Sequence, residues 1–163
     1  MSFIQKYDFN IKLIVIILSM IQPFILLSIC GELWSLSSYW NTSLQPFFII
    51  INASTSYFLF STEKWIIPSV FLLLLTAFSI DLFPNLHNIF ACIFFISCFP
   101  PLMTLKRFKF FGYFYLISIF VLLHLGMLWF EIYCVLVLGM YHLIIILYKR
   151  NLDMKRERLN HKL

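Results

Sequence analysis

Long apolar runs separated by short polar breaks fill most of this 163-residue chain. A helix needs roughly 20 apolar residues to cross the hydrocarbon layer, so the pattern predicts an all-α, polytopic membrane protein with six transmembrane helices. The expected spans cover residues 13–29, 44–60, 65–83, 86–103, 110–128 and 131–148. They predict one domain, residues 1–148, a single six-helix bundle. Residues 149–163 then form a highly charged tail.

Different sequence features indicate where the apolar runs are interrupted. The polar stretch 81–88 separates the third and fourth spans and places Asp81 close to His87. Residues 110–148 are too many for one span and enough for two, so we expect a break at Trp129-Phe130-Glu131. Gln22-Pro23 interrupts the first run, where proline predicts a kink. Trp and Tyr between the first two runs are typical of a loop at the headgroup level.

Composition excludes an ordinary soluble domain. Hydrophobic residues make up 62% of the chain and charged residues 12%, against about a quarter charged in soluble domains. The mean hydropathy is +0.93. The Phe-, Ile- and Asn-rich usage is typical of an AT-rich bacterium, so the expected location is the bacterial inner membrane.

Positive charge is confined to alternate connections. All twelve Lys and Arg residues lie in the head, in the turns at 61–64 and 104–110, and in the tail. Because short cytoplasmic loops carry the excess of Lys and Arg, both termini are predicted to be cytoplasmic. The net charge of +5 then requires no nucleic acid. The tail would instead meet anionic inner-leaflet lipid through Lys149, Arg150, Lys155, Arg156 and Arg158.

The opposite face gathers acids and histidines. Carboxylates and imidazoles bind zinc and perform general acid–base chemistry, so a site there is chemically possible. The candidate catalytic residues are Asp81, His87, His124 and Glu32, and the candidate zinc ligands are His87, His124 and Asp81. The alternative is that the acids, Glu131 among them, reach water at span ends and the histidines serve as hydrogen-bond partners. No HExxH or comparable ligand spacing is present.

Other polar residues lie inside the expected spans. His142, about eleven residues into the sixth span, must face the bundle or a cavity, either as a functional group or as a neutral, hydrogen-bonded one. Rows of small and polar residues in the second, third, fourth and sixth spans favour close helix packing. The same residues would serve a lipid headgroup pocket or a transport path. Cys30 and Cys134 both fall near the outer face, where they either pair or remain free thiols.

Two motifs carry a resemblance to a known family. They are Ser35-Leu36-Ser37-Ser38-Tyr39-Trp40-Asn41 and His87-Asn88-Ile89-Phe90-Ala91-Cys92-Ile93-Phe94-Phe95. This pair resembles the six-helix damage-regulated autophagy modulators, with their GPI-remodelling relatives and small bacterial members. The second span opens with Leu44-Gln45-Pro46-Phe47-Phe48 in place of that family's charged start. The resemblance implies a membrane protein concerned with lipids or lipid-linked processes.

Two classes of function stay open at this point. The first is a non-enzymatic integral membrane protein that binds lipid or a membrane partner protein, alone or as a homo-oligomer. The second is a small membrane hydrolase or lipid-modifying enzyme. A fainter similarity to alkaline ceramidase-type metal hydrolases rests on the combined Ser, Asp and His, without their seventh span or paired-histidine motif. A transporter is third, because no inverted repeat with broken helices is present.

Overall fold

The computed structural model describes residues 3–160, and within them it contains helices and no strand. Side chains are described from residue 8 to residue 156, Phe60 apart. The expected all-α class is confirmed. The α-helices of this part of the chain are α1 (Phe3–Cys30), α2 (Gln45–Phe60), α3 (Ile66–Ala77), α4 (Pro84–Thr104), α5 (Phe110–Leu125) and α6 (Met127–Asn160). Short 3₁₀ helices connect them: η1 (Leu36–Asn41), η2 (Glu63–Trp65) and η3 (Lys106–Phe108).

Four segments are long and apolar enough to cross a membrane. They are Asp8–Cys30, Pro84–Thr104, Lys106–Leu125 and Met127–Arg156. The chain is therefore an integral membrane protein. The helices α2 and α3 have 16 and 12 residues, or about 24 Å and 18 Å at 1.5 Å per residue. The third expected span ran to residue 83, but α3 ends at Ala77 because Phe78 takes an extended conformation, φ −102° and ψ 106°.

The break between the last two helices lies at Gly126, three residues before the expected Trp129-Phe130-Glu131. Gly126 has φ +88° and ψ −178°, a backbone region that only glycine occupies readily. The helix α5 ends at Leu125 and α6 begins at Met127. This correction moves Glu131 out of the expected connection and into α6, where only 6% of its surface is exposed.

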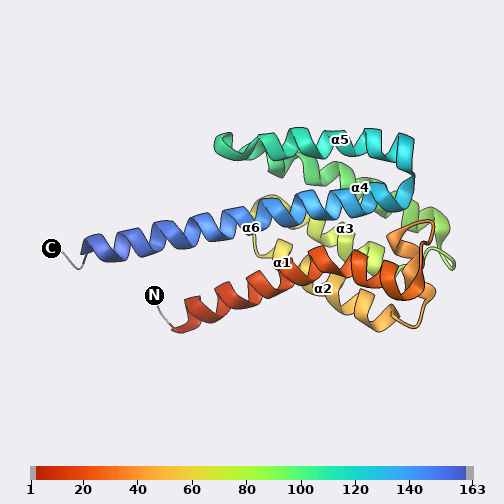
Figure 1. Ribbon diagram of the computed structural model, residues 1–163, viewed down its shortest axis with the longest axis horizontal. Helices are drawn as coiled ribbons and strands as arrows, with labels where there is room; N and C mark the ends of the chain where they lie inside the picture. Colours follow the sequence, from red (N-terminus) through yellow and green to blue (C-terminus); the bar gives the residue numbers. More distant parts are fainter. Residues whose placement is uncertain (1–2, 161–163) are drawn as a thin grey trace.

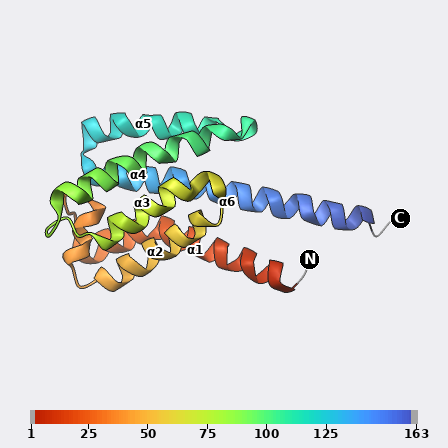
Figure 2. The same cartoon turned by 180° about the vertical axis from the view of Figure 1, so that it is seen from behind.

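The six helices run back and forth along one axis, so the connections gather at two ends (Figure 1). We call one the basic end: it holds both termini, the α2–α3 turn and the α4–α5 turn. We call the other the loop end: it holds residues 31–44, residues 78–83 and Gly126. Every Lys and Arg of residues 3–160 belongs to the basic end or its helix extensions. Figure 2 shows α6 continuing beyond the other helices there.

Two apolar clusters form the core. One joins α3, α4, α5 and α6 around the fully buried Cys98 and Leu102. The other lies nearer the loop end and packs Leu26 of α1 and Tyr39 of η1 against Leu128 of α6. Large apolar side chains also cover outward surfaces, as on α5, where Phe120 and Leu123 are 64% and 72% exposed. Such a surface suits lipid rather than water.

Close helix contacts use small residues, as the polar and small rows in the sequence predicted. Ser56 of α2 and Ser69 of α3 are both buried, and each hydroxyl donates to the other residue's backbone carbonyl at 2.7 Å. Gly139 of α6 lies against the side chain of Met20 of α1, with no room for a Cβ. These contacts hold α2 against α3 and α1 against α6.

Candidate functional site

The connections at the loop end are fixed by hydrogen bonds to the helices. The buried carboxylate of Glu131 accepts from the backbone N–H of Leu36, with N and Oε2 2.5 Å apart. The indole Nε1 of Trp40 donates to the carbonyl of Thr76 at 2.9 Å. The helix η1 is thereby attached to α6 on one side and to α3 on the other. It lies across the bundle rather than in solvent, since Ser37 and Tyr39 are buried.

Tyr39 anchors η1 from inside the bundle. Its hydroxyl donates to the carbonyl oxygen of Gly31 at 2.6 Å, and none of its side chain is exposed. Burial penalises the charged phenolate and raises the pKa of Tyr39 above its ordinary value of 10.0. The side chain therefore stays neutral over the physiological pH range.

The sequence placed Asp81 and His87 side by side as candidate catalytic and metal-binding residues. His87 is buried, and its Nδ1 lies 2.7 Å from the carbonyl oxygen of Phe78. Because a carbonyl only accepts, Nδ1 carries the hydrogen. Asp81 is exposed and accepts a hydrogen bond from Asn41 Nδ2 at 2.5 Å. Both side chains thus connect loop segments.

The remaining two candidates lie elsewhere. Glu32 accepts a hydrogen bond from Trp129 Nε1 at 3.2 Å, and His124 is exposed near the end of α5. Among the described side chains of residues 8–156, no three His, Cys, Asp or Glu come together as metal ligands would. Cys30 and Cys134 are both free thiols, as are Cys92 and Cys98.

A groove of about 350 Å³ opens at the loop end between η1, α4, α5 and α6. The body of the groove is apolar and is formed by residues such as Phe95, Ile96 and Phe130. One end carries polar groups. They are Ser35, Ser37, His87, Asn88 and Glu131. Of the four catalytic candidates, His87 is the one that lines this groove. An apolar body with a few polar groups at one end is the usual make-up of a ligand site.

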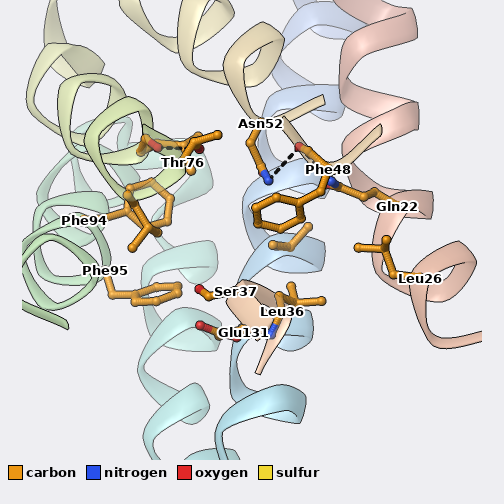
Figure 3. Close-up of a pocket in the computed structure, with 13 residues that line it drawn as sticks. Gln22, Leu26, Leu36, Ser37, Phe48, Asn52, Thr76, Phe94, Phe95 and Glu131 are labelled. Carbon is orange, nitrogen blue, oxygen red and sulfur yellow. Dashed lines mark hydrogen bonds between the residues drawn. The ribbon is translucent and has the colours of Figure 1, made fainter. Parts of the chain in front are cut away.

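Two smaller cavities continue inward from the groove. The middle cavity, about 50 Å³, shares Ser37, Phe95 and Glu131 with the groove. The inner cavity, about 80 Å³, shares Gln22 and Asn52 with the middle one and reaches His142. Figure 3 shows Gln22 of α1 and Asn52 of α2 on one side of the middle cavity, with Ser37 and Glu131 nearer the loop end.

Glu131 is the residue that sequence reasoning left out of the candidate site. It lines both the groove and the middle cavity, yet the expected break at 129–131 placed it in a connection. The signal that could have found it is Gly126, which ends α5 in a glycine-specific conformation. With the turn at Gly126, Glu131 falls in the second turn of α6.

Comparisons with known proteins give no support for a family assignment. No protein-family model, curated protein or solved structure matches the chain. The resemblance carried by residues 35–41 and 87–95 therefore stays a prediction.

Proposed function

We propose that this protein binds one amphiphilic lipid in the loop-end groove and does not convert it chemically. The observation that carries the proposal is the make-up of the groove, which combines an apolar body with polar groups at the loop end. An acyl chain would lie against Phe95, Ile96 and Phe130. A headgroup would meet Ser35 and Asn88, which line the groove near the loop end.

The groove lies between helices at the bundle surface rather than in a closed core. Asn88 and Ile96 of α4 are exposed, Ile96 to 73% of its surface. Trp34, at the rim, is 66% exposed, as expected of an aromatic anchor at the membrane interface. A lipid could therefore enter from the bilayer without first passing through water.

The hydrolase alternative receives less support. An enzyme of that kind needs a metal or an acid–base pair directed at the substrate. Here His87 lines the groove, but Asp81, its expected partner, bonds to Asn41 instead and forms no acid–base pair with it. Asp81, His124 and Glu32 do not line the groove. Binding without chemistry is the simpler use of this site.

Orientation is part of the proposal. We infer that the chain crosses the membrane six times, α2 and α3 included, with both termini and the basic end in the cytoplasm of a bacterium. The alternation of basic and non-basic connections supports it. Reporter fusions after residues 64, 107 and 150 should report a cytoplasmic location, and fusions after residues 41, 82 and 126 an external one.

Lipid retention tests the binding proposal. Protein purified in mild detergent is analysed by native mass spectrometry, with extracted lipids quantified against protein. We expect about one tightly held lipid per chain. Ala91→Trp, which adds bulk inside the groove, should remove it, while Leu123→Trp on the outward face of α5 should leave it bound. Equal retention by both variants, in folded protein, would contradict the proposal.

A further inference from the structure

The middle and inner cavities adjoin one another inside the bundle, and together we call them the interior track. Most of their lining is apolar, but each carries several polar side chains, Gln22 and Asn52 among them. The interior track begins at Glu131, where the middle cavity meets the loop-end groove, and ends at His142, beside the α2–α3 turn of the basic end. Both residues belong to α6 and lie eleven positions apart, or about 16 Å along the helix. An ionisable group inside a membrane bundle is a functional candidate by default.

His142 supplies the second observation. Its Nε2 is buried and has no hydrogen-bond partner among the described residues. The imidazole packs against Trp65, with ring centroids 4.5 Å apart, and against Phe58 at 5.3 Å. Neither ring makes a hydrogen bond to Nε2 in this packing. The inner cavity beside this residue provides the space for one.

The polar residues between the two ends present acceptors to the cavities. Gln22 and Asn52 each donate an amide hydrogen to the carbonyl of Phe48, at 3.2 Å and 3.0 Å. Their side-chain oxygens are left for other donors. Thr55 and Thr76 donate to carbonyls of their own helices and likewise keep hydroxyl lone pairs. These oxygens give a water molecule in either cavity polar partners along an otherwise apolar lining.

The volumes suit a short chain of water molecules. Each buried water needs about 10–15 Å³ of cavity volume, together with two to four polar partners. Cavities of about 50 Å³ and 80 Å³ therefore have room for a few waters beside these polar side chains. Neither cavity is lined by Lys or Arg, and their titratable lining residues are Glu131 and His142. The adjoining groove adds His87 and Cys92.

We propose that the interior track is a proton pathway in which water-mediated transfer joins the Glu131 carboxyl to the His142 imidazole. A proton from the loop-end groove binds the Glu131 carboxylate, the carboxyl donates a proton to the first cavity water, and the last water donates one to His142. Nε2 of His142 accepts that proton while the imidazole releases its Nδ1 proton toward the basic end, and a flip of the ring restores the starting state. No electron transfer or covalent step is involved. This activity goes beyond lipid binding, although both uses share Glu131.

Exit at the basic end requires a small movement. Leu59 and Trp65 line the inner cavity on either side of the exposed turn at 61–64. Trp65 itself is buried. Displacement of its ring would connect His142 to water, so flux should be slow and limited by this step.

Proton flux into vesicles tests the pathway. Purified protein is reconstituted into phosphatidylglycerol–phosphatidylethanolamine liposomes that contain a pH-sensitive dye, and valinomycin with a potassium gradient imposes a membrane potential. Wild type should acidify or alkalinise the lumen several-fold faster than protein-free liposomes. His142→Ala and Glu131→Gln should each lower the rate at least tenfold. His124→Ala, an exposed histidine on α5, should leave it unchanged.

A further variant covers the case in which a Glu131 change prevents folding. Asn52→Leu replaces a polar lining residue by an apolar one of similar size and should also abolish flux. Wild-type flux equal to that of empty liposomes would overturn the proposal. So would full flux in folded His142→Ala or Asn52→Leu protein.

Discussion

The two ends of the bundle use polar residues in opposite ways. At the loop end, side chains bond to other parts of the protein, as Trp40 does to Thr76 and Glu131 to Leu36. At the basic end, charged side chains lie along helix extensions with few partners. One contact there places the guanidinium of the exposed Arg150 4.4 Å from the centre of the buried Phe9 ring.

The difference indicates that polar residues at the loop end fix the structure, whereas those at the basic end set the orientation in the membrane. Hydrogen bonds between distant segments fix the loop end as one rigid unit, so it can hold a groove of defined shape. Lys and Arg at the basic end act on the membrane through their charge, which needs no fixed geometry. Changes at the loop end should therefore alter stability and binding, whereas changes at the basic end should alter mainly orientation.

The largest loss should follow from Gly126→Val. Valine is strained at φ +88° and ψ −178°, so α5 and α6 could no longer meet in this geometry. We expect a loss of about 3 kcal/mol in the free energy of unfolding, measured by denaturation in mixed micelles. By contrast, Gly112 at the basic end does not have a positive φ, so this strain argument applies to Gly126 and not to Gly112. A Gly126→Val protein as stable as wild type would contradict the strain argument.

The next effect tests whether His87 is a structural residue. His87→Ala leaves the Phe78 carbonyl without its partner and opens a space under the α3–α4 connection. A loss of about 2 kcal/mol is expected, within the usual range for an unsatisfied buried group. The matched change His124→Ala alters an exposed side chain and should cost close to nothing. Equal losses would refute the distinction between the two histidines.

Tyr39 adds a pH dependence to the loop end. Its raised pKa means that folding keeps the hydroxyl protonated where the unfolded chain would lose its proton. The resulting stability is present below pH 10 and declines as the pH rises through the raised value. Tyr39→Phe should cost about 1 kcal/mol at pH 8 and weaken this alkaline decline. Tyr57→Phe, an exposed change, serves as the control for thermal unfolding at pH 8 and pH 10.5.

The smallest effect belongs to the basic end. Arg150→Ala removes the contact with Phe9, which should contribute about 0.5 kcal/mol at this exposed site. Unfolding should be almost unaffected, while hydrogen exchange near residue 150 should accelerate slightly. A loss comparable to that of His87→Ala would show that both ends are held equally firmly.

Much of the fold follows from the sequence because long apolar runs leave few alternatives in a bilayer. The run that contains Pro84–Thr104 and the basic turn at 106–109 were both readable in this way. The end of α3 was not, since apolar residues continue past Ala77 at Phe78 and Ile80, up to the polar stretch that begins at Asp81. The helix ends there because Phe78 is extended and residues 80–82 turn, a conformation held by contacts such as the one between Phe78 and His87, which form only in the folded chain.

The candidate site was less readable. Sequence reasoning selected residues by chemical type and found His87, which does line the groove. It also selected Asp81 and Glu32, whose partners Asn41 and Trp129 are distant in sequence. Such pairings depend on three-dimensional proximity, which periodicity does not provide. A closer look at Gly126 would have moved Glu131 into α6 and toward the groove.

The most direct test of lipid binding at the loop end is photo-cross-linking. A phospholipid with a diazirine near the end of one acyl chain is added to purified protein, irradiated and mapped by peptide mass spectrometry. We expect adducts concentrated on the groove residues Phe95, Ile96 and Leu122, and competed away by unlabelled lipid. Adducts spread over the outward residues Phe120 and Leu123, with none in the groove, would contradict it.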